Sequence, residues 1–148
     1  MKIKIRKNIF RSTFCSLCIL TIVSLSWGGE IKQCIVCGMD VTKYSHTRYV
    51  VTTTGGEEFA TCGVQCGLTL HFRLKEKFKS AMATDLLSNR SFDAQKGYYV
   101  YKSTVITDMA PGFISFITRA NAEKFQKGFG GRVVSYQEAL EIWKEQMK

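Results

Sequence analysis

The chain has 148 residues, of which 45% are hydrophobic and 22% charged, with six cysteines and two histidines. This length suits one domain with a modest core, and the composition excludes disordered, collagen-like and coiled-coil chains. The formal net charge is +9, but no basic stripe is interleaved with aromatic residues, so the charge does not indicate a nucleic-acid-binding protein.

The N-terminal segment has the features of a secretory signal peptide in the usual order. Five basic residues precede residue 12, an apolar run covers residues 13–25, and small residues follow as far as Gly29. The run is shorter than the roughly 20 apolar residues of a membrane-spanning helix. We therefore expect residues 1–28 to be a signal peptide and residues 30–148 to be an exported, periplasmic domain. An uncleaved segment would instead anchor the protein to the membrane.

Removal of that segment changes the charge and the cysteine content. Without its five basic residues the net charge falls from +9 to +4, a value compatible with an acidic partner or membrane surface. Cys15 and Cys18 would be lost with the signal peptide. The predicted domain keeps four cysteines: Cys34, Cys37, Cys62 and Cys66. In an exported protein four cysteines commonly form two disulfides, which is one interpretation of this set.

The first half of the predicted domain alternates strand and helix patterns. Residues 47–54 are rich in β-branched and aromatic side chains, and Gly55-Gly56 predicts a turn into a returning strand at 57–61. Helical periodicity then covers 63 to about 81, with two neighbouring apolar stripes. Residues 86–94 are expected to be an extended or looped link.

The second half repeats this order. Strand patterns cover 98–105 and 113–118, and a helical pattern covers 120–127. Gly130 and Gly131 give the backbone freedom that a helix end requires. A short strand at 132–135 and an amphipathic helix at 136–147 complete the chain, with Ser135 and Glu138 spaced for a capping box.

The predicted elements form two successive strand–strand–helix units, roughly residues 47–81 and 98–127. Both units end in a helix after two strands that short turns join, which favours antiparallel pairing. The sequence therefore predicts an α+β fold, a small antiparallel sheet built from these two units plus a C-terminal helix.

The cysteines follow a pattern that is typical of metal sites. Cys34-x-x-Cys37 followed by Gly38 places two sulfurs within reach of one ion. Cys62-x-x-x-Cys66 lies where a predicted strand passes into a helix, so its two sulfurs are one turn apart on one face. A thiolate near a helix N-terminus is stabilised by the exposed N–H groups and the helix dipole.

Two methionines favour copper over zinc in this site. Thiolates bind both Cu(I) and Zn²⁺, but a neutral thioether is a good ligand for Cu(I) and a poor one for Zn²⁺. Met39 follows Cys37-Gly38 directly, and Met109 lies in a predicted loop before Pro111. His46 and His71 are the only histidines, which excludes a histidine-rich centre.

Three interpretations of the four cysteines stay open on this reasoning: a functional copper site, a closed structural zinc site and two disulfides. A thiol-disulfide oxidoreductase built on Cys34 and Cys37 is a weaker fourth, because Gly38 and a loop follow Cys37 where such enzymes have a helix. The sequence shows no Ser/His/Asp set, phosphate loop or paired carboxylates, so we do not expect an enzyme.

Several motifs together resemble the NosL family, accessory copper chaperones of nitrous-oxide reductase. They are Cys34-Ile-Val-Cys-Gly-Met39, the Gly55-Gly56 turn, the Cys62/Cys66 pair, Phe92-Asp-Ala94, Met109-Ala-Pro-Gly112 and Gly130-Gly-Arg-Val133. The cysteine spacing also resembles the TRASH-type metal-binding module. These motifs are spread over nearly the whole predicted domain.

The resemblance implies a small exported α+β protein that binds Cu(I) and passes it to a client protein, such as nitrous-oxide reductase. It implies Met39 and Met109 as thioether ligands, with Cys34 or Cys37 as the thiolate. The full set of four cysteines leaves room for a zinc ion beside the copper or in its place.

Overall fold

A computed structural model describes residues 33–107, 109–110 and 112–148. The predicted signal peptide and its alternative, a membrane anchor, lie outside the described residues. Over these three ranges, no helix combines the length and the apolar character needed to cross a membrane.

The first sheet contains four antiparallel strands in the order β2-β1-β3-β4. Its elements are β1 (Tyr49–Thr53), β2 (Glu58–Thr61), β3 (Phe78–Thr84) and β4 (Ser91–Asp93). Helix α1 (Val64–Leu74) follows β2 and packs on β1 and β3. A short 3₁₀ turn, η1 (Lys75–Lys77), leads from α1 into β3.

The second sheet contains three antiparallel strands in the order β6-β5-β7. Its elements are β5 (Tyr98–Tyr101), β6 (Phe113–Phe116) and β7 (Arg132–Ser135), with η2 (Ala94–Lys96) leading into β5. Helix α2 (Arg119–Phe129) follows β6 and packs on β5, β6 and β7. Helix α3 (Tyr136–Gln146) ends the chain and packs between α1 and β5.

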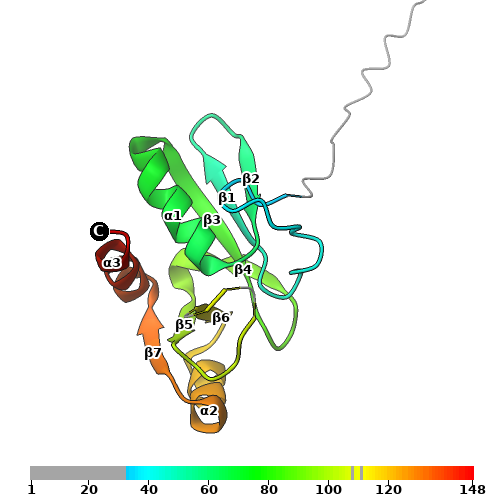
Figure 1. Cartoon of the computed structure of the whole chain (residues 1–148), viewed down its shortest axis with the longest axis vertical. Helices are drawn as coiled ribbons and strands as arrows, with labels where there is room; N and C mark the ends of the chain where they lie inside the picture. The colour runs from blue at the N-terminus through cyan, green and yellow to red at the C-terminus, as the bar shows by residue number, and fades with distance from the viewer. Residues whose placement is uncertain (1–32, 108, 111) are drawn as a thin grey trace, which may run out of the picture.

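The two halves of the chain have the same topology. In each half two antiparallel strands precede a helix, and the strand after the helix pairs with the first strand of that half. The sheet orders β2-β1-β3 and β6-β5-β7 are therefore equivalent. The prediction of an α+β fold from two strand–strand–helix units is confirmed, with the strands divided between two sheets. In Figure 1 the β1–β2 hairpin and α2 lie at opposite ends of the molecule.

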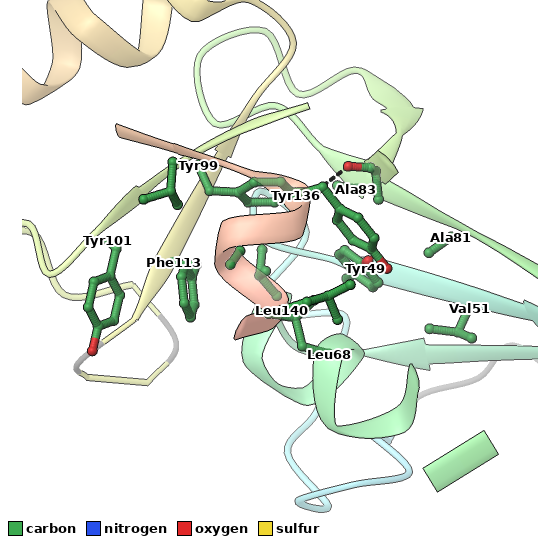
Figure 2. Packing of buried hydrophobic residues seen from close by; sticks show 14 of the residues in the cluster. Tyr49, Val51, Leu68, Ala81, Ala83, Tyr99, Tyr101, Phe113, Tyr136 and Leu140 are labelled. Carbon is green, nitrogen blue, oxygen red and sulfur yellow. Dashed lines mark hydrogen bonds between the residues drawn. The ribbon is translucent and has the colours of Figure 1, made fainter. Parts of the chain in front are cut away.

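The main core lies between the two halves and is rich in tyrosine. Tyr49 of β1, Tyr99 of β5 and Tyr136 of α3 converge there with Leu68 of α1 and Leu140 of α3, as Figure 2 shows. The rings of Tyr99 and Tyr136 stand 6.3 Å apart at a tilt of 46°. Burial of such large side chains is the main stabilising term of a domain of this size.

The predicted helix over 63–81 is too long. Helix α1 ends at Leu74, where Lys75 takes a φ of 50°, and residues from Phe78 onward form β3. The spacing of Leu74 and Phe78 fits one helix face, but Ala81 and Ala83 alternate in burial with exposed Met82, which is the strand period. Pairing with both β1 and β4 fixes β3 as a strand, and local periodicity does not contain that information.

A buried carboxylate joins the two sheets. Asp85 follows β3 and is 1% exposed, and its Oδ2 accepts the Ile117 N–H at 2.8 Å just beyond β6. Its Oδ1 accepts the Ser88 N–H and hydroxyl, each at 2.8 Å. Burial disfavours the charged form, but these hydrogen bonds outweigh it and lower the pKa of Asp85 below 3.8. Both carboxylate oxygens are thus bonded at the contact between the halves.

Candidate metal centre

The first cysteine pair is carried by a tight loop that needs a glycine. The Gly38 N–H donates to the Cys34 carbonyl at 2.7 Å, and the Cys34 N–H donates to the Met39 carbonyl at 2.7 Å. Gly38 has a φ of +76°, which side-chain-bearing residues rarely adopt. The loop buries Cys34 and leaves Cys37 exposed. The glycine after Cys-x-x-Cys is therefore required by the backbone of this turn.

The second cysteine pair lies at the junction of β2 and α1. Cys62 follows β2, Gly63 is the N-cap of α1, and Cys66 is in the first helical turn. Thr61 and Thr47 fix this junction, because the Thr61 hydroxyl donates to the Gly63 carbonyl at 3.1 Å and the Thr47 hydroxyl to the Cys62 carbonyl at 2.7 Å. Gly63 has no side chain that could cap α1, so the first N–H groups of the helix have no acceptor from the N-cap residue.

The two pairs meet in one cluster, which we call the cysteine cluster. The Sγ atoms of Cys34, Cys37, Cys62 and Cys66 all lie within 4.8 Å of one another. The Cys37 and Cys62 sulfurs are 3.5 Å apart, and the Cys62 and Cys66 sulfurs are 3.7 Å apart. Four sulfurs bound tetrahedrally at about 2.3 Å from one ion stand about 3.8 Å apart, whereas a disulfide requires about 2.05 Å. The spacing thus fits one enclosed ion, and no disulfide joins these cysteines.

Both methionines singled out in the sequence pack on the apolar group that surrounds the cysteine cluster. Met39 and Met109 are half-buried and pack on the apolar group that contains Cys34, Cys62 and Cys66. Met39 comes from the Cys34–Cys37 loop, and Met109 comes from the connection between β5 and β6. The structure therefore brings all six predicted ligand residues together from three separate segments. Figure 1 shows the first of these, residues 34–47 in cyan, beside β1 and β2.

Two thiols of the cluster, Cys37 and Cys66, resist ionisation. Desolvation raises the pKa of Cys37 to about 11, with hydrogen bonds to Cys34 and Cys62 adding to the effect and those with the Met39 backbone and Cys66 opposing it. The hydrogen bond with Cys62, followed by burial, raises the pKa of Cys66. A bound cation reverses this balance, because its charge favours the thiolate form of each ligand.

Access to the cluster is one-sided. Cys34, Cys62 and Cys66 are each at most 2% exposed, and Cys37 is the exposed member. Neighbouring Ile35 is 54% exposed. An ion that enters or leaves this cluster therefore meets Cys37 first.

The two histidines are not part of the cysteine cluster. His46 is exposed in the turn after Tyr44 and lines a shallow hollow of about 250 Å³. His71 of α1 is half-buried, with its Nδ1 3.1 Å from the Tyr136 hydroxyl and its ring 4.1 Å from that of Phe78. Burial lowers the pKa of His71 below 6.5. The ring of His71 is thus held in the contact between α1 and α3.

The sequence analysis missed two residues that shape this region. Gln65, inside the Cys62–Cys66 interval, donates from its Nε2 to the Met109 carbonyl at 3.0 Å. Tyr44 packs on the apolar surroundings of the cluster and also lines the hollow beside it. A glutamine among the apolar residues of a first helical turn was a usable signal, but its partner lies 44 residues away.

Comparisons with known proteins identify the family of the chain and a shared fold. The family model described as NosL matches residues 29–142, which is most of the chain. The crystal structure of the copper chaperone NosL from Shewanella denitrificans superposes with a TM-score of 0.66 at 20% sequence identity. That match covers 72% of this chain and 87% of the other, and it shows a shared fold.

The chain is also similar to a protein described as a transcriptional repressor. The HTH-type transcriptional repressor CutR from Bacillus subtilis (strain 168) is 28% identical over 110 residues, which are 74% of this chain. The match covers 57% of the repressor, so this chain spans little more than half the length of that relative.

Proposed function

The chain belongs to the NosL family, and from this premise we propose that it is an exported metallochaperone that carries Cu(I) to a periplasmic client. Nitrous-oxide reductase, the client associated with the family, is the candidate receiver. In this role the chain binds and releases its cargo without catalysing a reaction. The periplasmic location rests on the signal-peptide pattern of residues 1–28.

The observation that carries this proposal is the composition of the site. Four thiols lie within 4.8 Å of one another, and two methionines pack on the same apolar group. Thiolates suit both Cu(I) and Zn²⁺, whereas thioethers are good ligands for Cu(I) and are not among the usual ligands of Zn²⁺. Met39 and Met109 thus distinguish a copper site from a zinc site with the same cysteines.

Exposed Cys37 supplies the means of transfer. A partner that docks at this surface brings its own ligand to the one thiolate that solvent reaches, and the ion moves by exchange of one bond at a time. The exposed apolar side chain of Ile35 beside it gives such a partner an apolar contact. Buried Cys34, Cys62 and Cys66 hold the ion until that exchange begins.

A structural zinc site is the second candidate, and one observation favours it. Four cysteine sulfurs at near-tetrahedral spacing are the donor set of closed zinc sites. In that case the protein would be an adaptor whose function is protein contact. The exposure of Cys37 weighs against a closed site.

Metal competition on the exported protein tests both candidates. The protein is isolated anaerobically from the periplasm, its intact mass shows whether residues 1–28 have been removed, and Cu(I) and Zn²⁺ are added in competition. We expect one Cu(I) per chain. Met39→Leu should weaken Cu(I) binding about tenfold, or about 1.4 kcal/mol, and leave Zn²⁺ binding unchanged.

The matched control is Met82→Leu, because Met82 is an exposed methionine of β3 outside the cluster. It should change neither metal. Preferential retention of Zn²⁺, or binding of neither metal together with the absence of titratable thiols, would contradict the copper carrier. An intact mass that still includes residues 1–28 would contradict signal cleavage and favour the membrane anchor.

A further inference from the structure

We propose that Gln65 is a positioning residue that holds Met109 against the cysteine cluster. The inference rests on the proposed function, since it treats Met109 as a ligand of the Cu(I) cargo. Gln65 itself contacts no cargo in this scheme. It acts through the hydrogen bond from its side-chain amide to the Met109 main chain.

The contact joins the metal-binding helix start to a distant segment. Gln65 is the second residue of α1, between Cys62 and Cys66, and it is 1% exposed. Its Nε2 donates to the Met109 carbonyl at 3.0 Å. The residue that lies between the two cysteines of the junction therefore also binds the backbone of the candidate thioether ligand.

The packing on the other side of the contact is equally close. A Cβ atom added to Gly112 would stand 2.5 Å from the Gln65 Nε2 and 2.5 Å from the Met109 carbonyl oxygen. Such distances are far below van der Waals contact, so glycine at this position lets the backbone close over the amide. Gly112 and Gln65 thus both contact the Met109 carbonyl, one by close packing and the other by a hydrogen bond.

Other described hydrogen bonds hold the ends of the β5–β6 connection. The Lys102 N–H donates to the Gly112 carbonyl at 3.2 Å, and the Thr104 N–H donates to the Phe129 carbonyl at 2.8 Å. These bonds position the base of the connection beside α2. The Gln65 amide bonds Met109 itself and joins it to the helix that carries Cys66.

The second polar atom of Gln65 argues against a purely structural role. Its Oε1 is buried, and within residues 33–107, 109–110 and 112–148 no group donates a hydrogen bond to it, which is unfavourable for an acceptor out of reach of solvent. A leucine would fill a similar volume without that cost. The amide is therefore better explained by the directional bond to Met109 than by stability alone.

A double-mutant cycle on Cu(I) affinity tests the inference. Gln65→Leu and Met109→Leu are made singly and together, and Cu(I) affinity is measured by competition with a colorimetric chelator. We expect each single variant to weaken binding about tenfold, because loss of an orienting contact commonly costs 10- to 100-fold in metal affinity. The double variant should bind Cu(I) as the Met109→Leu variant does, because Gln65 acts through Met109.

Two further variants serve as a matched control and as an independent test of the same contact. Gln126→Leu is the matched control, since the Gln126 Nε2 makes the same kind of bond, to the Gly131 carbonyl at 3.0 Å, away from the cysteines. It should leave Cu(I) affinity unchanged. Gly112→Ala breaks the same contact from the other side, so it should reproduce the affinity loss of Gln65→Leu and replaces that variant if it does not fold. X-ray absorption of the Cu(I) complexes should show one sulfur ligand fewer in both.

Each outcome decides between the two proposals. If the wild-type protein binds Cu(I) and Met109→Leu weakens it while Gln65→Leu and Gly112→Ala do not, the positioning role is wrong and the carrier function stands. Equal losses from Gln65→Leu in the wild-type and Met109→Leu backgrounds would also overturn it. A wild-type protein that binds no Cu(I) would overturn the carrier function and this inference together.

Discussion

Two of the described strand-to-helix junctions, β2–α1 and β6–α2, have the same backbone layout but different chemistry. In each, the N-cap of an eleven-residue helix stands two residues beyond the end of the preceding strand. At the β2–α1 junction the N-cap is Gly63, which makes no side-chain cap. At the β6–α2 junction it is Thr118, whose hydroxyl accepts the Asn121 N–H at 3.2 Å.

The residues next to the two N-caps also differ in chemistry. Cys62 and Cys66 occupy the positions that Ile117 and Asn121 hold in the second junction. The Ile117 N–H donates to the carboxylate of Asp85, so in the second junction a fully hydrogen-bonded anion holds the backbone. In the first junction the neighbouring groups are the thiols of Cys62 and Cys66, and the raised pKa of Cys66 keeps that thiol neutral in the absence of a cation. One junction thus holds the halves together, and the other has the donors to hold a cation.

The largest expected effect comes from removing a thiol of the first junction. Cys66→Ser should lower Cu(I) affinity by about 100-fold, equivalent to about 2.8 kcal/mol, if four ligands share a metal-binding free energy of about 12 kcal/mol. Chelator competition measures this loss. Thermal unfolding without metal should change little, because serine is close to cysteine in size and leaves only a small cavity at this buried position. A large loss of stability with unchanged Cu(I) affinity would make Cys66 a structural residue.

The opposite result is expected at the second junction. Asp85→Asn replaces the charged acceptor of the Ile117 and Ser88 N–H groups and should lower the free energy of unfolding by about 2 kcal/mol. Chemical denaturation at pH 7 measures the loss, and Cu(I) affinity should be unchanged. Asp93→Asn is the matched control, since this half-buried carboxylate caps η2 and asparagine caps equally well.

The pH dependence identifies the charge as the cause. The pKa of Asp85 is lowered in the folded protein, so its contribution is complete above the unfolded value of 3.8 and is lost as pH falls through the folded value. The stability difference between the wild-type protein and Asp85→Asn should therefore be constant from pH 7 to pH 5 and shrink below pH 4. A difference that persists at pH 2 would assign the effect to packing.

The sequence predicts the two units and the cysteine site, but not the contacts that depend on distant residues. Alternating β-branched strands and paired glycines indicate both units, and the Cys-x-x-Cys and Cys-x-x-x-Cys spacings indicate one site, because these signals are local. Two features depend on distant partners. Phe78 belongs to β3 since β1 and β4 pair with that strand, and Gln65 matters through a carbonyl in another connection. Asp85 was missed for the same reason, because its partner Ile117 lies beyond β6.

A smaller effect on stability is expected at the contact between α1 and Tyr49 of the core. Gly67 of α1 corresponds to Ala122 of α2, which is fully buried without strain in the second unit. In the first unit a Cβ at residue 67 would stand 2.2 Å from the ring of Tyr49, which has no exposed surface. Overpacking costs about 2 kcal/mol here and the helix gains about 1 kcal/mol from alanine, so Gly67→Ala should destabilise the protein by about 1 kcal/mol.

Gly128→Ala in α2 separates these two terms, because a Cβ there meets no atom within 4 Å. This variant should gain stability from helix propensity alone, with chemical denaturation as the measurement for both. If Gly67→Ala is also stabilising, the ring of Tyr49 has room to move and the junction does not depend on it. If Gly67→Ala is destabilising and weakens Cu(I) binding as well, the position of Cys66 depends on contact between α1 and β1. The tyrosine core would then set the geometry of the thiol site in the first unit, a constraint that the second unit avoids by accepting alanine.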